Sequence, residues 1–146
     1  DVARRVARWM VVFLQRPGGQ AQFSVWTEAA SPVSTGLREI LDAVVADPGA
    51  DHSIAAMADR AAVSERHLVR MFRAQVGMTP ARYVERARVE AAKVLLAASD
   101  HSQEAVARRA GFGSADTMRR TFRRALGVSP SSYRRRFRTT GVGPPA

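Results

Sequence analysis

The sequence predicts an all-α fold in which two copies of one helical unit are joined by a long helix. Dense helix signals between Leu37 and Phe137 and a repeat of about fifty residues support this fold class. We expect about seven helices, preceded by a helical extension at the N-terminus. The chain of 146 residues is long enough to bury an ordinary core without disulfides or metal ions.

Composition excludes several kinds of site. The chain has no cysteine, so it has no disulfide framework, no thiolate nucleophile and no zinc site with cysteine ligands. It has no glycine-rich phosphate loop and no convincing pair of nucleophile and base, so we expect neither enzymatic activity nor a cofactor. The three histidines are far apart in sequence, and we expect His67 to be packed or to lie at the surface rather than to bind a metal.

The chain is expected to be cytoplasmic and to make no contact with membranes. Its longest strongly apolar run, from Trp9 to Leu14, is too short to cross a bilayer. Because the first residue is Asp rather than Met, we expect the chain to begin inside a longer parent protein.

Positive charge is concentrated in the C-terminal third. The net charge is +10, and residues 101–146 carry ten basic and two acidic side chains, whereas residues 1–100 carry thirteen and eleven. A basic segment of this kind suits a polyanion. All but one of the 23 basic residues are arginine, whose planar fork fits guanine edges and phosphates, although the codon bias of a GC-rich genome is an alternative cause of the excess.

The repeat consists of nine identities at an offset of 50 residues and four more, just upstream, at an offset of 49. The change of offset places one extra residue in the turn of the second copy. Two copies indicate a duplicated supersecondary unit rather than a solenoid. The first set pairs Ser64, Arg70, Phe72, Arg73, Gly77, Pro80, Tyr83, Arg86 and Arg88 with Ser114, Arg120, Phe122, Arg123, Gly127, Pro130, Tyr133, Arg136 and Arg138; the second pairs Ser53, Ala58, Arg60 and Ala61 with Ser102, Ala107, Arg109 and Ala110.

Each copy is predicted to contain a short helix, a tight turn and a longer amphipathic helix. Ser53 and Ser64 are the expected N-caps in the first copy, and Ser114 is the expected N-cap of the longer helix in the second. Gly77 is expected just past a helix end, and Thr79 is expected to cap the helix that starts at Pro80. The expected inward residues are Ile54, Met57, Ala58, Ala61, Leu68, Phe72 and Val76 in the first copy and Ala105, Val106, Ala110, Met118, Phe122 and Leu126 in the second, with Tyr83 and Tyr133 also in the core.

This layout is that of a helix-turn-helix, homeodomain-like unit, in which the second helix enters the major groove of DNA. Between the copies we expect a helix from Pro80 to Ala98, about 28 Å long. Successive major-groove faces of B-DNA are roughly 34 Å apart, which leads to the hypothesis that one chain reads two neighbouring grooves of an asymmetric site. The expected buried stripe of the joining helix is Val84, Ala87, Ala91, Val94, Leu95 and Ala98.

The stretch from Leu37 to Phe137 resembles the AraC/XylS family of transcriptional regulators. The segment VARRAGFGSADTMRRTFRRALGVSPSSYRRRF, from Val106 to Phe137, carries the turn, the Arg-Thr-Phe core and the Gly-Val-Ser-Pro ending typical of that family. The string RPGGQAQFS, from Arg16 to Ser24, resembles the junction in members that have a class I amidotransferase-like (PfpI-type) sensor domain.

The resemblance implies a domain organisation. Residues 1–26 would be the tail of a missing sensor domain, 27–36 a linker and 37–138 the DNA-binding domain, followed by a disordered tail over 139–146. Within the DNA-binding domain, the first helix-turn-helix would cover 37–79, the joining helix 80–98 and the second helix-turn-helix 99–138.

The resemblance also implies which residues contact base edges. In the first copy these are Arg66, Val69 and Arg70, where Val69 meets a thymine methyl group or nothing. In the second copy Asp116 either accepts from a cytosine amine or only complements the helix dipole. The arginines of both copies could instead form surface salt bridges, and those further along the helices suit phosphates better than bases. The full expected set is Arg66, Val69, Arg70, Arg73, Asp116, Thr117, Arg119, Arg120 and Arg123.

The function expected is sequence-specific regulation of transcription, with double-stranded DNA and RNA polymerase as partners and dimerisation through the missing N-terminal domain. The first copy is expected to contribute most base discrimination, and the second, more basic copy to contribute phosphate affinity. The run Arg134, Arg135 and Arg136 either binds a phosphate or is solvated. The alternative is a basic helical module that binds nucleic acid without specificity, or that binds RNA polymerase.

Overall fold

The computed structural model describes residues 33–139, and the expectations for the N-terminal extension, the sensor-domain tail, residues 27–32 and residues 140–146 lie outside this range. The described part is all-α, as predicted, and contains no strand. Its helices are α3 (Thr35–Ala46), α4 (Ile54–Ala61), α5 (Glu65–Gln75), α6 (Pro80–Ala98), α7 (Gln103–Ala110), α8 (Ala115–Leu126) and α9 (Pro130–Thr139).

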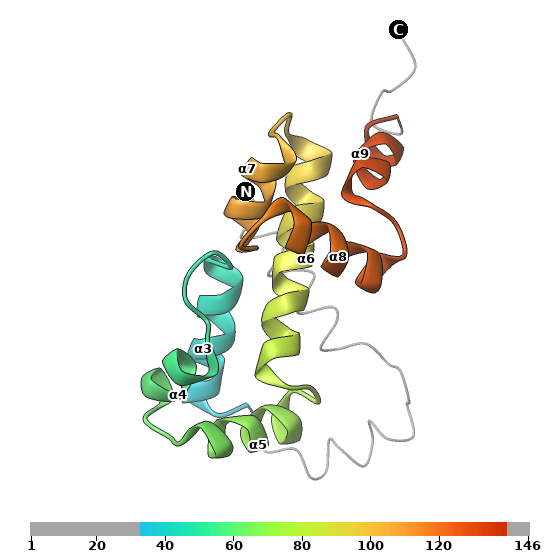
Figure 1. Cartoon of the computed structure of the whole chain (residues 1–146). Coiled ribbons are helices and arrows are strands. Elements are labelled where there is room, and N and C mark those ends of the chain that lie inside the picture. The colour runs from blue at the N-terminus through green and yellow to red at the C-terminus, as the bar shows by residue number, and fades with distance from the viewer. Residues whose placement is uncertain (1–32, 140–146) are drawn as a thin grey trace, which may run out of the picture.

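Helix α6 runs between two helical units and belongs to both of them (Figure 1). The first unit consists of α3, α4 and α5, and the second of α7, α8 and α9. Helices α3 and α5 pack on α6 from the first unit, while α7, α8 and α9 pack on it from the second. The predicted duplication therefore corresponds to two structural units that share one central helix.

Hydroxyl side chains fix where most of these helices begin. Ser53, Ser64 and Ser114 each accept a hydrogen bond from the backbone N–H three residues later, as predicted. Thr79 does the same for α6, whose first residue is Pro80. Such caps each contribute about 1 kcal/mol of stability. Helix α3 begins at Thr35, and Ser34 makes no side-chain cap there.

The longer helix of each unit is held by a buried phenylalanine that meets a tyrosine of the following helix. Phe72 and Tyr83 lie edge to face with ring centroids 6.0 Å apart, and Phe122 and Tyr133 repeat this geometry at 5.5 Å. Phe72, Tyr83 and Phe122 are buried, as predicted. Tyr133 is only half-buried, because α9 lies at the outer edge of the second unit, where the ring also stacks on Phe137 at 4.3 Å.

The predicted stripe of α6 is partly wrong. Val84, Ala87 and Ala91 are buried, but Val94 and Leu95 are half-buried and Ala98 is exposed. The side chains buried in their place are Val89, Glu90, Ala92 and Leu96. Because helices from both units pack on α6, its buried surface is wider than the single stripe of an ordinary amphipathic helix.

Leu126 is also a correction, because its side chain is 38% exposed rather than inward-facing. The last buried residue of α8 is Phe122. The helix ends one turn later at Leu126 and is followed by Gly127, whose φ is +74°. The final turn therefore projects beyond the core.

We expect Phe122→Ala to lower the free energy of unfolding by about 3–5 kcal/mol, because it opens a cavity and removes the ring contact with Tyr133. Leu126→Ala, four residues later on the same helix, is the matched control and should cost less than about 1 kcal/mol. Urea unfolding followed by circular dichroism measures both values. Equal losses would mean that Leu126 belongs to the core after all.

Candidate nucleic-acid interface

Helices α5 and α8 each begin directly after a tight turn whose first residue has a left-handed backbone. In the first unit this residue is Ala62, with φ +55°, and in the second it is Gly111, with φ +96°. Three residues separate α4 from α5, and four separate α7 from α8, which accounts for the change of offset in the repeat. In both units the turn sets the direction of the helix that carries the candidate site residues.

Helix α5 presents three arginines to solvent. Arg66, Arg70 and Arg73 are exposed, and none makes a hydrogen bond or ion pair through its side chain with another residue of the described part. Their spacing of four and three residues places them along one side of the helix. Val69 is half-buried beside them. The first copy thus offers unengaged guanidinium groups, which are good ligands for guanine edges and phosphates.

Helix α8 presents a second arginine face, in which the acidic residue has a partner. Arg119, Arg120, Arg123 and Asp116 are all exposed. The Asp116 carboxylate lies 2.6 Å from the Arg119 guanidinium in the first turn of the helix. An exposed pair of this kind contributes little to stability. Its effect is to restrict where the Arg119 side chain points.

Thr117 has a local role at the start of α8. It is half-buried, its backbone N–H donates to the Ser114 hydroxyl at 3.1 Å, and the two hydroxyl groups are 3.1 Å apart. Arg124, which was not among the expected site residues, is paired across to Glu85 of α6 at 2.7 Å. These contacts connect the second arginine face to the end of the turn and to the central helix.

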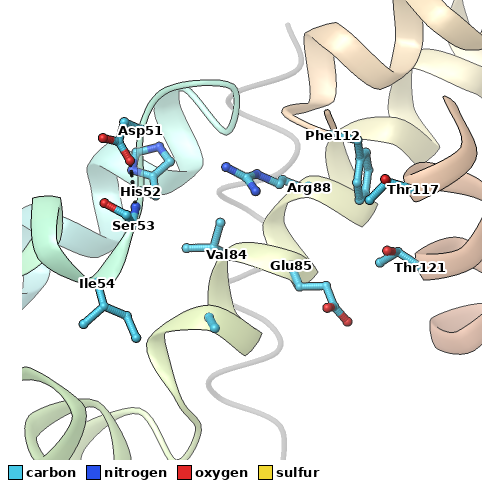
Figure 2. A pocket seen from close by; sticks show the side chains of 11 residues that line it. Asp51, His52, Ser53, Ile54, Val84, Glu85, Arg88, Phe112, Thr117 and Thr121 are labelled. Atoms are coloured by element: carbon cyan, nitrogen blue, oxygen red, sulfur yellow. Dashed lines mark hydrogen bonds between the residues drawn. The ribbon is translucent and has the colours of Figure 1, made fainter. Parts of the chain in front are cut away.

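A hollow of about 440 Å³ lies between the two units. Figure 2 shows residues 51–54 on one side of it, α6 in the middle, and Phe112, Thr117 and Thr121 on the other. Asp51, Glu85 and Arg88 give it a polar, charged lining. It was not predicted, because a hollow between units depends on their relative placement rather than on local pattern.

The shifted pKa values of the described residues have structural causes. Burial raises the pKa of Glu90, although Lys93, 2.8 Å away, opposes that shift. Burial also raises the pKa of Tyr83 and lowers that of Arg88. Residues 33–139 contain no group of histidine, aspartate or glutamate side chains that could hold a metal ion. No helix in this range is long and apolar enough to cross a membrane.

Arg134, the first residue of the C-terminal arginine run, is hydrogen-bonded within the fold. Its Nε donates to the Leu96 carbonyl at 3.2 Å, and its terminal nitrogen donates to the His101 carbonyl at 2.7 Å. The side chain is half-buried and fastens α9 to the end of α6, so it is not simply solvated. Arg138 makes a similar contact, because it donates to the carbonyl of Ser99, the residue after α6, at 2.9 Å.

We expect Arg134→Ala to destabilise the second unit by about 1.5–3 kcal/mol, because it removes charged hydrogen bonds to two backbone carbonyls. Arg135→Ala removes the same charge from an exposed neighbour and should cost less than about 0.5 kcal/mol. Thermal unfolding of both variants at one salt concentration makes the comparison. If the two melting temperatures coincide, Arg134 does not hold α9.

Comparison with known proteins shows which family has this two-unit arrangement. A family described as "Helix-turn-helix domain" matches residues 57–136. A protein of Streptomyces lividans described as an AraC-like transcription regulator is 35% identical over 115 residues, which cover 73% of this chain and 38% of the relative. The chain belongs to the AraC family of helix-turn-helix domains. The resemblance to AraC/XylS regulators drawn from residues 37–137 is thereby confirmed.

Two further relatives of this AraC-family domain are informative. The "HTH-type transcriptional regulator Rv1931c" of Mycobacterium tuberculosis is 49% identical over 89 residues, which cover 61% of this chain and 34% of that protein. The crystal structure of the DNA-binding domain of AdpA, in complex with a target DNA, is 33% identical with a TM-score of 0.66, and covers 77% of this chain and 97% of that one. The chain spans about a third of the length of the curated relatives it matches.

Proposed function

We propose that this AraC-family domain is the DNA-binding part of a transcriptional regulator and reads an asymmetric site by placing α5 and α8 in adjacent major grooves. The observation that carries the proposal is the pair of exposed arginine faces, one on each unit, on helices held by a shared central helix. The relative solved with its target DNA has the same architecture, which supports this use of the fold.

The length of α6 fits the spacing of the grooves. It has 19 residues, so it is about 28 Å long. One turn of B-DNA is roughly 34 Å, which is the distance between two major-groove faces on the same side of the duplex. A single chain therefore suffices for two blocks of sequence, and no palindrome is needed.

The arginines divide into two groups by their position on the helices. Near the helix starts, Arg66 and Arg70 on α5 and Arg119 and Arg120 on α8 suit base edges, because the start of a recognition helix enters the groove first. Further along, Arg73 and Arg123 suit phosphates. Val69 and Thr117, both half-buried, complete the expected set and suit contacts with a thymine methyl group or the sugar-phosphate backbone.

Asp116 is best explained as the partner of Arg119 rather than as a cytosine reader. Their ion pair holds one edge of the Arg119 guanidinium, which leaves the other edge for a guanine. The charge balance supports a further division of labour. The first unit, with unpaired Arg66 and Arg70, contributes most of the base discrimination, and the strongly basic residues 101–146 contribute more of the phosphate affinity.

The decisive experiment is selection of bound sequences from random duplex DNA, followed by competition binding at physiological salt. We expect two sequence blocks about one helical turn apart and a preference for the selected site of roughly a thousandfold or more over random duplex. Equal affinity for both duplexes would refute specific reading and favour the alternative, a basic helical module that binds nucleic acid without specificity.

Arg70→Ala and Arg120→Ala should each weaken binding to the selected site by about 1–3 kcal/mol and relax base preference in one block only. Arg38→Ala, which removes the same charge from an exposed position on α3, is the control and should leave both affinity and preference nearly unchanged. Fluorescence anisotropy on the selected duplex and on single-base variants measures these effects. A loss that is equal on all sequences would make the two arginines phosphate contacts instead.

Membership of the subgroup with a PfpI-type sensor domain is also part of the proposal. It is supported by the string from Arg16 to Ser24, which lies outside the described residues. A regulator of this subgroup would dimerise through the sensor domain, contact RNA polymerase and act in the cytoplasm without enzymatic activity in the present chain. Cross-linking the longer parent protein to RNA polymerase and measuring its mass in solution would test these partners.

A further inference from the structure

The two units touch next to the hollow. Arg88 of α6 donates from Nε to the Pro48 carbonyl of the α3–α4 loop at 3.0 Å. A Cβ on Gly111, in the turn before α8, would lie 2.2 Å from that carbonyl oxygen and 2.8 Å from Arg88 Nε. No real Cβ atom fits at such distances. We call Pro48, Arg88 and Gly111 the junction.

The first-unit side of the junction is held by its own hydrogen bonds. A ring nitrogen of His52 lies 2.6 Å from the Asp47 carbonyl, and the Ser53 N–H donates to the Asp51 carboxylate at 3.0 Å. Arg60 donates to the Asp51 carbonyl at 3.1 Å. Figure 2 shows Arg88 reaching from α6 toward this segment. The conformation of the α3–α4 loop is thus held by hydrogen bonds within the first unit.

The second-unit side is equally constrained. Gly111 has φ +96°, and the N–H of Phe112 donates to the Ala107 carbonyl at 2.8 Å. The Phe112 side chain is buried. Gly49, next to Pro48, lies against the last turn of α7, since its Cβ would be 3.7 Å from the Arg108 carbonyl oxygen. Backbone from both units therefore meets in van der Waals contact.

The position of the junction connects it to both recognition helices. The α3–α4 loop ends at Ser53, the cap of α4, and α4 packs on α5. The turn that begins at Gly111 ends at Ser114, the cap of α8. A shift at the junction would therefore move α5 relative to α8.

The repeat indicates what is special about this point. Arg138 occupies the same repeat position as Arg88, and each donates to a carbonyl of the loop before the short helix of its copy. For Arg138 this is the Ser99 carbonyl, at 2.9 Å. In the first unit the corresponding bond joins Arg88 to Pro48, and Gly111 of the second unit packs directly against both partners. The Arg88–Pro48 bond therefore takes part in a contact between the units.

We propose that the junction fixes the distance and angle between α5 and α8 and thereby determines which spacing of the two DNA blocks the domain accepts. The inference rests on the proposed function and deepens it. One base pair moves a block by about 3.4 Å along the duplex and turns it by about 35°, which a rigid pair of helices cannot follow. A loosened pair could follow it, at the expense of affinity for the preferred spacing.

The test compares Gly111→Ala and Arg88→Met with Gly127→Ala. Gly127 has a similar left-handed backbone, with φ +74°, but no atom lies within 4 Å of its Cβ position, so this control reproduces the backbone strain without the collision. Circular dichroism establishes that each variant is folded. All variants are made in the full 146-residue chain.

The first readout needs no DNA. Because the chain has no cysteine, Ala74→Cys and Ala125→Cys introduce two spin labels at exposed positions near the ends of α5 and α8. We expect one narrow distance distribution for the parent chain and for Gly127→Ala, and a broadened or shifted distribution for Gly111→Ala and Arg88→Met. If these two variants gave the same distribution as the control, the claim that the junction holds α5 and α8 in place would be wrong.

The second readout is affinity for the selected duplex with one base pair inserted or removed between its blocks. Relative to the selected duplex, the affinity of the parent chain and of Gly127→Ala for the altered duplex should fall at least about tenfold. The affinity of Gly111→Ala and of Arg88→Met should fall less than about threefold. Altered label distances with an unchanged spacing preference would overturn the role in spacing. A parent chain that binds every duplex alike would refute the proposed function, while the label distances would still show whether the junction holds the helices.

Discussion

Each arginine-bearing helix depends on an edge-to-face contact between two aromatic rings. Phe72 of α5 packs edge to face on Tyr83 of α6, and Phe122 of α8 packs on Tyr133 of α9 in the same way. The helix after each arginine-bearing helix is thus part of that unit's core. In the first unit that helix is α6, which also carries the second unit. The connection between the units is therefore a shared core element rather than a linker, and this explains why α6 is buried on more than one side.

The sequence determined the helices well because their ends are local. A serine or threonine hydroxyl that accepts from a backbone N–H depends on a few neighbouring residues, so Ser53, Ser64, Thr79 and Ser114 could be identified without tertiary information. The exposed arginines of α5 and α8 were equally predictable, because they lie opposite an apolar stripe. The burial of Glu90 and Leu96 was not, since it depends on helices from both units covering α6.

Arginine was the residue for which sequence reasoning was least reliable. Exposed Arg66 and Arg70 and structural Arg88 and Arg134 belong to the same residue type and lie in similarly basic surroundings. Arg88 and Arg138 are identities of the repeat, but so are Arg70 and Arg120, so repetition alone does not separate structural arginines from exposed ones. Arg134 has no counterpart in the first copy, because Val84 stands at the same repeat position. Its two carbonyl partners, on Leu96 and His101, lie 38 and 33 residues away in sequence, so no local pattern indicates them.

The turn residues Ala62 and Gly111 make the two units unequal. Both adopt a left-handed backbone, but Ala62 is exposed and carries a side chain, whereas Gly111 lies against Pro48 and Arg88 and has no room for one. The units are therefore not interchangeable, although they descend from one pattern. A molecule with a fixed first and second half has a direction, and bound to an asymmetric duplex it would point one way only. Whatever is attached ahead of α3 would then always lie on the same side of the site, so reversing the site would reverse the orientation of the whole assembly.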